Sequence, residues 1–325
     1  MSFLTAHADA LLNRLTKNLA HRRKIAKRYA TDAFRLYDAD LPDYNAAIDV
    51  YADAAHVQEY EAPGTIDAAL ARDRFDDVLR ATATVLSIPR ERVFGKLRRK
   101  QKDFTQYQRA DVPPFELTMQ EGDARFLVEL ATHLDTGVFL DHRLVRSRIR
   151  AQASGLRFLN LFCYTATATV QAALGGAVRS LSVDLSNTYL EWAARNFAQN
   201  GLTAPAHRLE RADVVAWLEQ PIRESFDLIL LDPPTFSRSK KMDGEFDVAT
   251  DHLRLIALCM RRLTPGGTLW FSTNQRRFTL DPAVTQAFDV RDVTRQTMPE
   301  DFAGGAPIHH GFVIRARRDP EDPRG

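Results

Sequence analysis

The stretch FDLILLDPPTF, from Phe226 to Phe236, joins a buried-strand pattern to groups that can meet a ligand. Its apolar run is short enough for a fully buried parallel strand. The strand must end at Asp232, because Pro233 and Pro234 lack the backbone donors that a central strand requires. A carboxylate and then the ring of Phe236 therefore follow the carboxyl end of a strand, which is where ligands bind in open α/β sheets.

Polar side chains also end the three expected strands that come earlier in the chain. Asn160 lies near the end of the first, Asp184 ends the second and Asp213 ends the third. Because the carboxyl ends of parallel strands meet at one edge, these groups and Asp232 should line that edge. A carboxylate at the position of Asp184 can accept from both hydroxyls of a ribose. Asp213 can accept from an adenine amino group, and Asn160 can orient the amino acid part of a cofactor.

The loop after the first strand decides which nucleotide is expected. Residues 156–174 contain no glycine, so a GxGxxG motif is absent. A pyrophosphate needs glycines that let backbone N–H groups approach it, which makes NAD, FAD and ATP poor candidates. S-adenosylmethionine carries ribose and adenine without phosphate, and it is the cofactor that this loop favours.

The second half of the chain alternates between strand and helix patterns. This rhythm predicts an α/β fold with a Rossmann-like, doubly wound parallel sheet. We expect strands at 156–162, 179–185, 207–213, 226–232 and 268–273, helices at 167–174, 188–200, 214–219 and 247–263, and two closing strands at 291–298 and 311–317.

The first part of the chain has a different organisation. It predicts a smaller α+β domain with helices at 11–29 and 65–88, two or three strands within 33–61, and a hairpin over 115–130 that turns at 121–123. We place the domain junction near residue 130, which gives an accessory, RNA-binding domain at 1–130 and a second domain at 131–325. Residues 90–102 carry seven Lys or Arg, with Phe94, Phe104 and Tyr107 interleaved or nearby. This run suits single-stranded RNA, and a solvated loop explains it equally well.

Composition limits the class of protein. The chain has 325 residues, a net charge of +2 and 45% hydrophobic residues, as is ordinary for a globular protein of two domains. No apolar run approaches a membrane span, and the N-terminus lacks a signal-peptide pattern. Cys163 and Cys259 are the only cysteines, with no Cys/His cluster in the sequence. We therefore expect a cytoplasmic protein without a membrane partner and without a metal.

Taken together, these residues resemble the class I S-adenosylmethionine-dependent methyltransferases. More narrowly, NLFCYTATAT, VDLSNTYLEWAARNFAQNGL, LDPPTFSRSKKM and FSTNQRRF are similar to the guanine-N7 methyltransferase half of bifunctional 23S ribosomal RNA enzymes. The similarity continues upstream through NRLTKNL, FRLYDADLPDYNAAIDVY, QEYEAPGTIDAALAR and HLDTGVFLDHR, and so covers nearly the whole chain. The other half of those enzymes carries an RNA-binding THUMP domain, and we expect it as a separate partner.

The resemblance implies a role for each matching residue. The target base is expected at Asp232, Pro233 and Pro234. The cofactor is expected at Phe139, Asp141, Asn160, Phe162, Tyr164, Thr165, Asp184, Leu185, Asp213, Val214 and Asp232, where Phe139 and Asp141 cover it and Asp184 holds the ribose. The chain departs from the family in two places. Ala166 replaces a usual glycine, which puts cofactor affinity in question because alanine disfavours a positive φ. Thr273 and Gln275 stand where the family more often has Asn and Lys.

The implied reaction is methylation of 23S ribosomal RNA, free or in an assembling large subunit, at N7 of a guanine. N7 carries a lone pair and no proton, so attack on a sulfonium methyl needs no general base, and Phe236 can stack on the base. An exocyclic amine, N2 of guanine or N6 of adenine, is the alternative target, because Asp-Pro-Pro-aromatic motifs serve such groups. Methylation at carbon-5 of a pyrimidine would need a thiolate, and Cys163 and Cys259 are expected to be packing residues. A non-catalytic RNA-binding protein that keeps the fold is a further hypothesis, which the departure at Ala166 supports.

Overall fold

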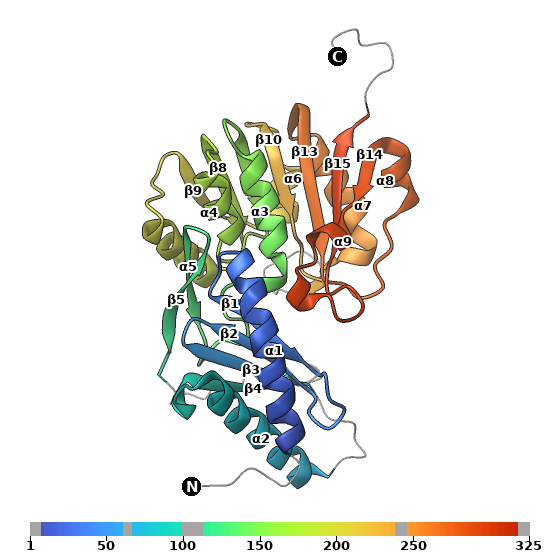
Figure 1. Ribbon diagram of the computed structural model, residues 1–325. Coiled ribbons are helices and arrows are strands. Elements are labelled where there is room, and N and C mark those ends of the chain that lie inside the picture. The colour runs from blue at the N-terminus through green and yellow to red at the C-terminus, as the bar shows by residue number, and fades with distance from the viewer. Residues whose placement is uncertain (1–7, 61–66, 99–112, 238–245, 318–325) are drawn as a thin grey trace. The chain divides into compact units, whose positions relative to one another are not determined.

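The computed structural model describes the chain except for residues 1–7, 61–66, 99–112, 238–245 and 318–325. Contacts divide the chain into two compact units, Met1–Leu140 and Asp141–Gly325, and each contains both helices and strands (Figure 1). Among the described residues, no helix is both long enough and apolar enough to cross a bilayer.

The first unit is built on a four-stranded sheet in the order β1-β2-β3-β4. The first three strands are antiparallel, whereas β3 and β4 are parallel because α2 crosses over between them. The expected helices, strands and 121–123 hairpin are all confirmed. Their bounds are α1 Ala8–Arg28, β1 Ala33–Asp38, β2 Ala46–Tyr51, β3 Ala54–Tyr60, α2 Ala68–Leu86, β4 Val93–Arg98, β5 Glu116–Glu121 and β6 Ala124–Glu129. Residues 99–102 of the basic run, with Phe104 and Tyr107, lie outside the described residues. Residues 90–98 form a single 3-10 turn followed by β4, so this part of the run is not a solvated loop.

The core of the first unit lies between its sheet and its helices. Leu11 and Leu15 of α1 and Val78 of α2 pack against Ile48 and Val57 of the sheet. Apolar residues at helical spacing therefore give each helix one buried face, as the sequence pattern predicts.

The segment after β6 belongs to the first unit, so the observed division lies ten residues after the expected junction near 130. The buried carboxylate of Glu129 accepts hydrogen bonds from the backbone N–H groups of Ala131, Thr132 and His133. Burial alone would raise the pKa of Glu129, but hydrogen bonds from the backbone and side chain of His133 and from the backbone of Phe115 and Thr132 lower it to about 2. The hydroxyl of Tyr51 lies 2.8 Å from that of Thr136, which fastens the segment a second time.

The second unit is a seven-stranded sheet in the order β14-β15-β13-β10-β7-β8-β9. Strands β13, β10, β7, β8 and β9 are parallel, and β15 is antiparallel to both of its neighbours. This is the doubly wound α/β fold that the sequence predicts. The bounds are α3 Arg143–Gln152, β7 Arg157–Leu161, α4 Thr167–Leu174, β8 Arg179–Asp184, α5 Asn187–Gln199, β9 His207–Arg211, α6 Val214–Glu219, β10 Phe226–Leu231, β11 Phe236–Ser237, β12 Phe246–Asp247, α7 Val248–Met260, β13 Leu263–Thr273, α8 Pro282–Ala287, β14 Phe288–Asp292, α9 Thr294–Thr297 and β15 His310–Ala316.

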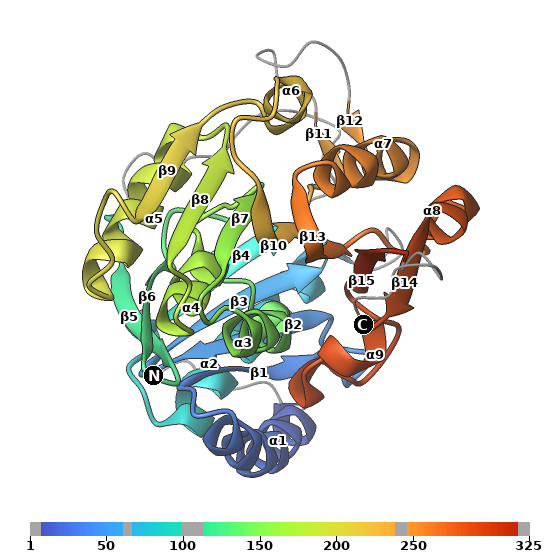
Figure 2. The ribbon, with the colours of Figure 1, turned by 90° about the horizontal axis from the view of Figure 1, so that it is seen from above.

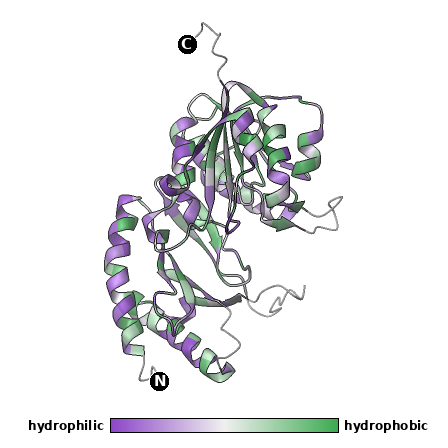
Figure 3. Ribbon diagram, turned by 90° about the vertical axis from the view of Figure 1, so that its right-hand side faces the viewer, coloured by the Kyte–Doolittle hydropathy of each residue, from purple (hydrophilic) through white to green (hydrophobic). Residues whose placement is uncertain are grey.

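Helices cover both faces of this sheet, with α3 and α4 on one side and α6 and α7 on the other (Figure 2). Strand β10 shows why. Leu228 and Leu230 belong to the apolar cluster with α3 and α4, whereas Ile229 and Leu231 belong to the cluster with α6 and α7. A strand that is buried on both faces reads as a continuous apolar run. Figure 3 shows the hydrophobic colour running through the strands of this sheet.

Two expectations near the C-terminus need correction. The segment 291–298 is not one strand, because β14 ends at Asp292 and α9 follows. The side chain of Asp292 accepts from the backbone N–H of Thr294, which favours a turn over an extended chain. The strand expected at 268–273 starts earlier, at Leu263. Its register against β10 shifts across Pro265-Gly266-Gly267, so these residues form an irregularity within β13 instead of lying before it.

Gly175, at the end of α4, marks a close approach between two helices. A Cβ atom at this position would lie 2.2 Å from the carbonyl oxygen of Arg150 in α3. Real Cβ atoms essentially never come so close to a backbone atom. The packing of α3 on α4 therefore depends on a residue without a side chain.

Candidate active site

The loop between β7 and α4 is fixed from inside the sheet. Asn160 is 2% exposed, and its Nδ2 donates to the hydroxyl of Thr169 at 2.9 Å. That hydroxyl lies 2.7 Å from the hydroxyl of Ser182 in β8. The amide of Asn160 thus ties β7 to the first turn of α4. Its expected contact with a cofactor remains a prediction.

The same loop holds three residues other than glycine in the left-handed region. Phe162, Tyr164 and Ala166 have φ values of 55°, 53° and 57°. Such a conformation costs a non-glycine residue on the order of 1–2 kcal/mol. Ala166 is fully buried and occupies the N-cap position of α4, where its methyl group cannot accept a hydrogen bond. The usual glycine of the family at this position predicts a positive φ, and Ala166 has one.

Asp184, at the end of β8, is oriented by two backbone N–H groups, one from that loop and one from the turn after β8. Its Oδ2 accepts from the N–H of Tyr164 and its Oδ1 from the N–H of Ser186, both at 2.9 Å. Burial raises the pKa of Asp184 above that of an ordinary aspartate, and these backbone donors oppose the rise. Each oxygen keeps acceptor capacity, so the pre-oriented carboxylate can take two hydroxyl donors.

Aromatic and backbone contacts complete the surroundings of Asp184. The ring of Tyr164 meets that of Tyr189 edge to face at 4.5 Å, and Trp192 lies 6.4 Å away. Thr165 is fully buried, and its carbonyl accepts from Asn196 at 2.9 Å. The structure therefore brings together Phe162, Tyr164, Thr165, Asp184 and Leu185 at one end of β7 and β8.

Asp213 and Val214 begin α6 after the neighbouring strand. Oδ1 of Asp213 accepts from the N–H of Ala216 at 3.0 Å, so this acid is the N-cap of the helix. Val214 is buried in the core between the sheet and α7. An adenine contact by Asp213 is a prediction that would have to coexist with this capping role.

Asp232 follows β10, where the sequence places it, and two residues flank its carboxylate. Ser272 of β13 donates to Oδ1 at 2.6 Å, while Nδ1 of His142 lies 3.6 Å from Oδ2. Sequence reasoning missed both neighbours. Ser272 could have been found from the parallel pairing of Leu231 with Phe271, which puts the next residue of each strand side by side.

The Pro-Pro turn exposes the aromatic ring that follows it. Pro233 is buried, Pro234 is exposed, and Phe236 is 47% exposed. The hydroxyl of Thr235 donates to Oδ1 of Asn274 at 2.5 Å, which links this turn to the segment after β13. Phe236 also pairs with Asp247 in the short ladder between β11 and β12. A stiff turn thus presents a large apolar side chain near Asp232.

Two expected residues need separate mention. Phe139 is 42% exposed and belongs to the first unit, whereas the other expected site residues belong to the second. Asp141 opens the second unit, and its Oδ2 lies 3.0 Å from Nδ1 of His309. The cofactor contact expected of each remains a prediction.

Both cysteines are buried, as the sequence analysis expects for packing residues. Burial raises the pKa of the Cys163 thiol and also that of the Cys259 thiol. A nucleophilic thiolate is therefore disfavoured at both positions.

A doubly wound sheet with an antiparallel β15, a pre-oriented acid after β8 and an Asp-Pro-Pro turn after β10 defines a class I methyltransferase fold. The chain belongs to the S-adenosylmethionine-dependent methyltransferase family, whose family model matches residues 49–312. The residues fit this cofactor, because Asp184 offers oriented acceptors for a ribose and the loop at 156–174 lacks the glycines that a pyrophosphate needs.

Curated relatives are similar to almost the whole chain. The protein named Ribosomal RNA large subunit methyltransferase K/L from Saccharophagus degradans is 50% identical over 317 residues, which are 96% of this chain and 42% of that protein. The protein of the same name from Chromohalobacter salexigens is 52% identical over 310 residues, covering 95% of this chain and 42% of its own. The chain thus spans less than half the length of these relatives.

Solved structures show the same fold. The crystal structure of SMU.776 complexed with SAH has a TM-score of 0.76 at 24% identity, over 96% of this chain and 83% of that one. A SAM-dependent methyltransferase from Streptococcus mutans has a TM-score of 0.73 at 23% identity, over 96% and 82% of the two chains.

Proposed function

We propose that this chain methylates N7 of a guanine in 23S ribosomal RNA, as an RlmK-type enzyme. The observation that supports the proposal most is the identity of about half the residues, over 96% of the chain, to proteins named Ribosomal RNA large subunit methyltransferase K/L. That name covers two activities. The Asp-Pro-Pro turn and the exposed Phe236 are the features of this chain that we assign to the target guanine.

S-adenosylmethionine supplies an electrophilic methyl group on a sulfonium. The residues of the chain then need to bind and align the two reactants, and alignment can contribute roughly 7–11 kcal/mol in favourable cases. Asp184 holds the ribose, and the backbone of Phe162, Tyr164 and Thr165 shapes the cofactor loop. Pro233 and Pro234 keep the turn stiff, so that Phe236 stacks on an unstacked guanine.

Asp232 has a different role for each possible target atom. For N7, it accepts from an amino group of the guanine and orients the base, and it receives no proton from the nucleophile. For an exocyclic amine, which is the alternative target, it would stabilise the positive charge that develops on nitrogen. The hydrogen bond from Ser272 fixes Oδ1 and so aims the carboxylate in either case.

Methyl transfer to unmodified 23S RNA tests this function. Labelled S-adenosylmethionine and the purified chain are incubated with RNA transcribed in vitro, and the nucleosides are then identified by mass spectrometry. We expect 7-methylguanosine. N2-methylguanosine or N6-methyladenosine would assign the target to an exocyclic amine, and cofactor binding without any methyl transfer would favour a binding protein. An Asp184→Ala variant serves as the control for cofactor-dependent label.

The remaining assignments follow from this proposal. The substrate is free 23S RNA or an assembling large subunit in the cytoplasm, and the first unit is an accessory RNA-binding part of the chain. A separate RlmL-type partner would supply the second activity that the relatives' name covers. A pull-down between the two proteins tests whether they bind. A comparison of RNA affinity with and without the partner tests the effect of that binding.

A further inference from the structure

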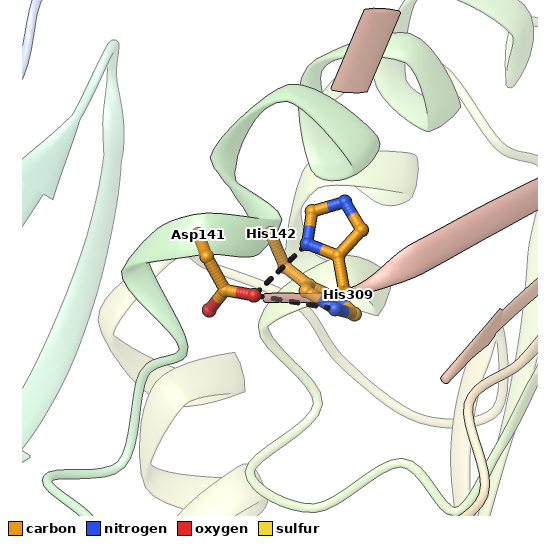
Figure 4. A group of neighbouring side chains, drawn as sticks. All are labelled: Asp141, His142 and His309. Carbon is orange, nitrogen blue, oxygen red and sulfur yellow. Dashed lines mark hydrogen bonds and ion pairs between the residues drawn. The ribbon is translucent and has the colours of Figure 1, made fainter. Parts of the chain in front are cut away.

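Three side chains of the second unit gather at one point, two from adjacent residues and the third from much later in the chain (Figure 4). Asp141 and His142 precede α3, and His309 precedes β15. Oδ2 of Asp141 lies 3.0 Å from Nδ1 of His309 and 3.8 Å from Nε2 of His142. One potential ligand atom from each residue falls within 4.8 Å of the others. Both imidazoles are buried, which separates this group from an ordinary solvated cluster.

The outer nitrogen of each imidazole faces a second group. Nε2 of His309 lies 3.1 Å from the hydroxyl of Thr297, and Nδ1 of His142 lies 3.6 Å from Oδ2 of Asp232. Histidines that bind metals usually direct their other nitrogen to a carboxylate, a backbone carbonyl or water. Asp232 is such a carboxylate, and the hydroxyl of Thr297 takes the corresponding place beside His309.

Each nitrogen of His142 faces a carboxylate. Nε2 lies 3.8 Å from Oδ2 of Asp141, and Nδ1 lies 3.6 Å from Oδ2 of Asp232. A cation between Nε2 and Asp141 would leave the other nitrogen for Asp232.

We propose that Asp141, His142 and His309 bind a single divalent transition-metal ion of the zinc type. Two ligands that each lie about 2.0–2.1 Å from zinc at a tetrahedral angle are roughly 3.3 Å apart. The distances of 3.0 and 3.8 Å from Asp141 to the two imidazoles lie on either side of this spacing, and the two imidazole nitrogens, within 4.8 Å of each other, would move closer together on binding. Two imidazoles favour zinc over magnesium, which prefers oxygen ligands. The ion would join the start of α3 to the start of β15 and orient His142 beside Asp232, and methyl transfer itself needs no metal.

Metal content and affinity test the proposal without RNA or cofactor. The protein is stripped with a chelator, titrated with zinc by calorimetry, and its cobalt complex is examined by visible absorption. We expect one ion per chain and the d–d bands of a tetrahedral cobalt site. His309→Asn should abolish both, whereas His310→Asn, a change at the adjacent and half-buried histidine, should leave both unchanged. Equal loss in the two variants would overturn the assignment.

Thr297→Val supplies a graded test that keeps all three ligands. It removes the hydroxyl beside Nε2 of His309, and loss of such a partner typically weakens metal affinity 10–100-fold. Circular dichroism melts should show that this variant and His309→Asn are folded. If the folded wild-type protein takes up no zinc or cobalt, the group is a direct Asp141–His309 hydrogen bond beside a second histidine, and the proposal is wrong. That result would leave the methyltransferase function untouched, because its assay is independent.

Discussion

The two carboxylates at the edge of the second unit's sheet, Asp184 and Asp232, are held in place by different means. Around Asp184, the positioning groups are backbone N–H donors, one from a loop with three left-handed residues and one from the turn that follows β8. Around Asp232, they are side chains, namely Ser272 on the carboxylate and Asn274 on the turn through Thr235. The comparison teaches that the proposed cofactor side depends on backbone conformation, whereas the proposed target side depends on individual side chains. Substitutions should therefore separate cofactor affinity from turnover.

Asp184→Ala should give the largest effect, on cofactor affinity. Hydrogen bonds to a charged acceptor contribute about 1.5–3 kcal/mol each, so binding of S-adenosylmethionine should weaken by about 3 kcal/mol. Isothermal titration calorimetry measures this loss. Asp281→Ala, which removes a carboxylate that caps α8, is a matched control and should bind normally. An unchanged affinity of the Asp184 variant would rule out the ribose assignment.

Phe236→Ala should act on the other side, by slowing methyl transfer roughly ten- to a hundredfold while cofactor binding stays nearly intact. Stacking of a base on an aromatic ring is worth about 1–3 kcal/mol. Turnover on 23S RNA is compared with that of Ile222→Ala, which removes another exposed apolar side chain of the second unit. If the melting temperature and the cofactor affinity fall together instead, the ring packs under the turn and does not stack.

Asp232→Asn should be milder, with a loss of less than about tenfold if the target is N7, because a lone-pair nucleophile gives up no proton. Single-turnover kinetics with saturating cofactor measure the step. A loss of several orders of magnitude would move the target to an exocyclic amine. Either result sharpens the contrast with Asp184→Ala. That variant should weaken cofactor binding more than it slows methyl transfer at saturating cofactor.

Ala166→Gly should have a small effect of the opposite sign. Glycine adopts the positive φ of this position without strain, and it also raises the entropy of the unfolded chain. The free energy of unfolding should rise by up to about 1 kcal/mol, and the affinity for S-adenosylmethionine should stay equal or improve. Ala168→Gly, inside α4, should destabilise the protein by about 1 kcal/mol instead. If Ala166→Gly destabilises equally, the loop conformation is not strained by alanine.

The pH dependence of cofactor binding should show the smallest effect. The folded pKa of Asp184 is raised by burial, so its carboxyl group takes up a proton at a higher pH than an ordinary aspartate does. A ribose hydroxyl needs the ionised form as acceptor. The affinity for S-adenosylmethionine should therefore be highest at neutral pH and should fall as the pH drops through the raised pKa of Asp184. Calorimetry between neutral and mildly acidic pH checks this, and the Asp184→Ala variant should lack the dependence.

Most of the fold could be predicted because its signals are local. The alternation of Leu228 to Leu231 between two apolar clusters appears in the sequence as an unbroken apolar run, and the helix at 167–174 has the bounds that were expected. The segment 291–298 has a strand-like composition, but the hydrogen bond from the N–H of Thr294 to the side chain of Asp292 favours a turn. A junction near 130 was expected because the pattern changes there, but Glu129 binds the next residues back to the first unit.

The site was predictable only where it follows strand order. Asp184 and Asp232 end strands, so counting strands finds them. Ser272, His142 and His309 reach the same region through pairing between strands and through the approach of segments some 170 residues apart, as in the 3.0 Å contact between His309 and Asp141. No local pattern carries that information. Asn160 shows the reverse case, because it lies near the end of β7 as predicted while its amide is engaged within the fold, and its cofactor contact stays a prediction.

The contact at Gly175 limits how this sequence can evolve. Every missense change of that codon introduces at least a Cβ atom, which would displace the carbonyl of Arg150 and with it the end of α3. A helix of ten residues is about 15 Å long. Its other end adjoins His142, whose Nδ1 lies 3.6 Å from Asp232, so a shift of α3 as one body would reach the neighbourhood of Asp232. Genetic variation far from the reacting groups is thus restricted by the same helix that supports them.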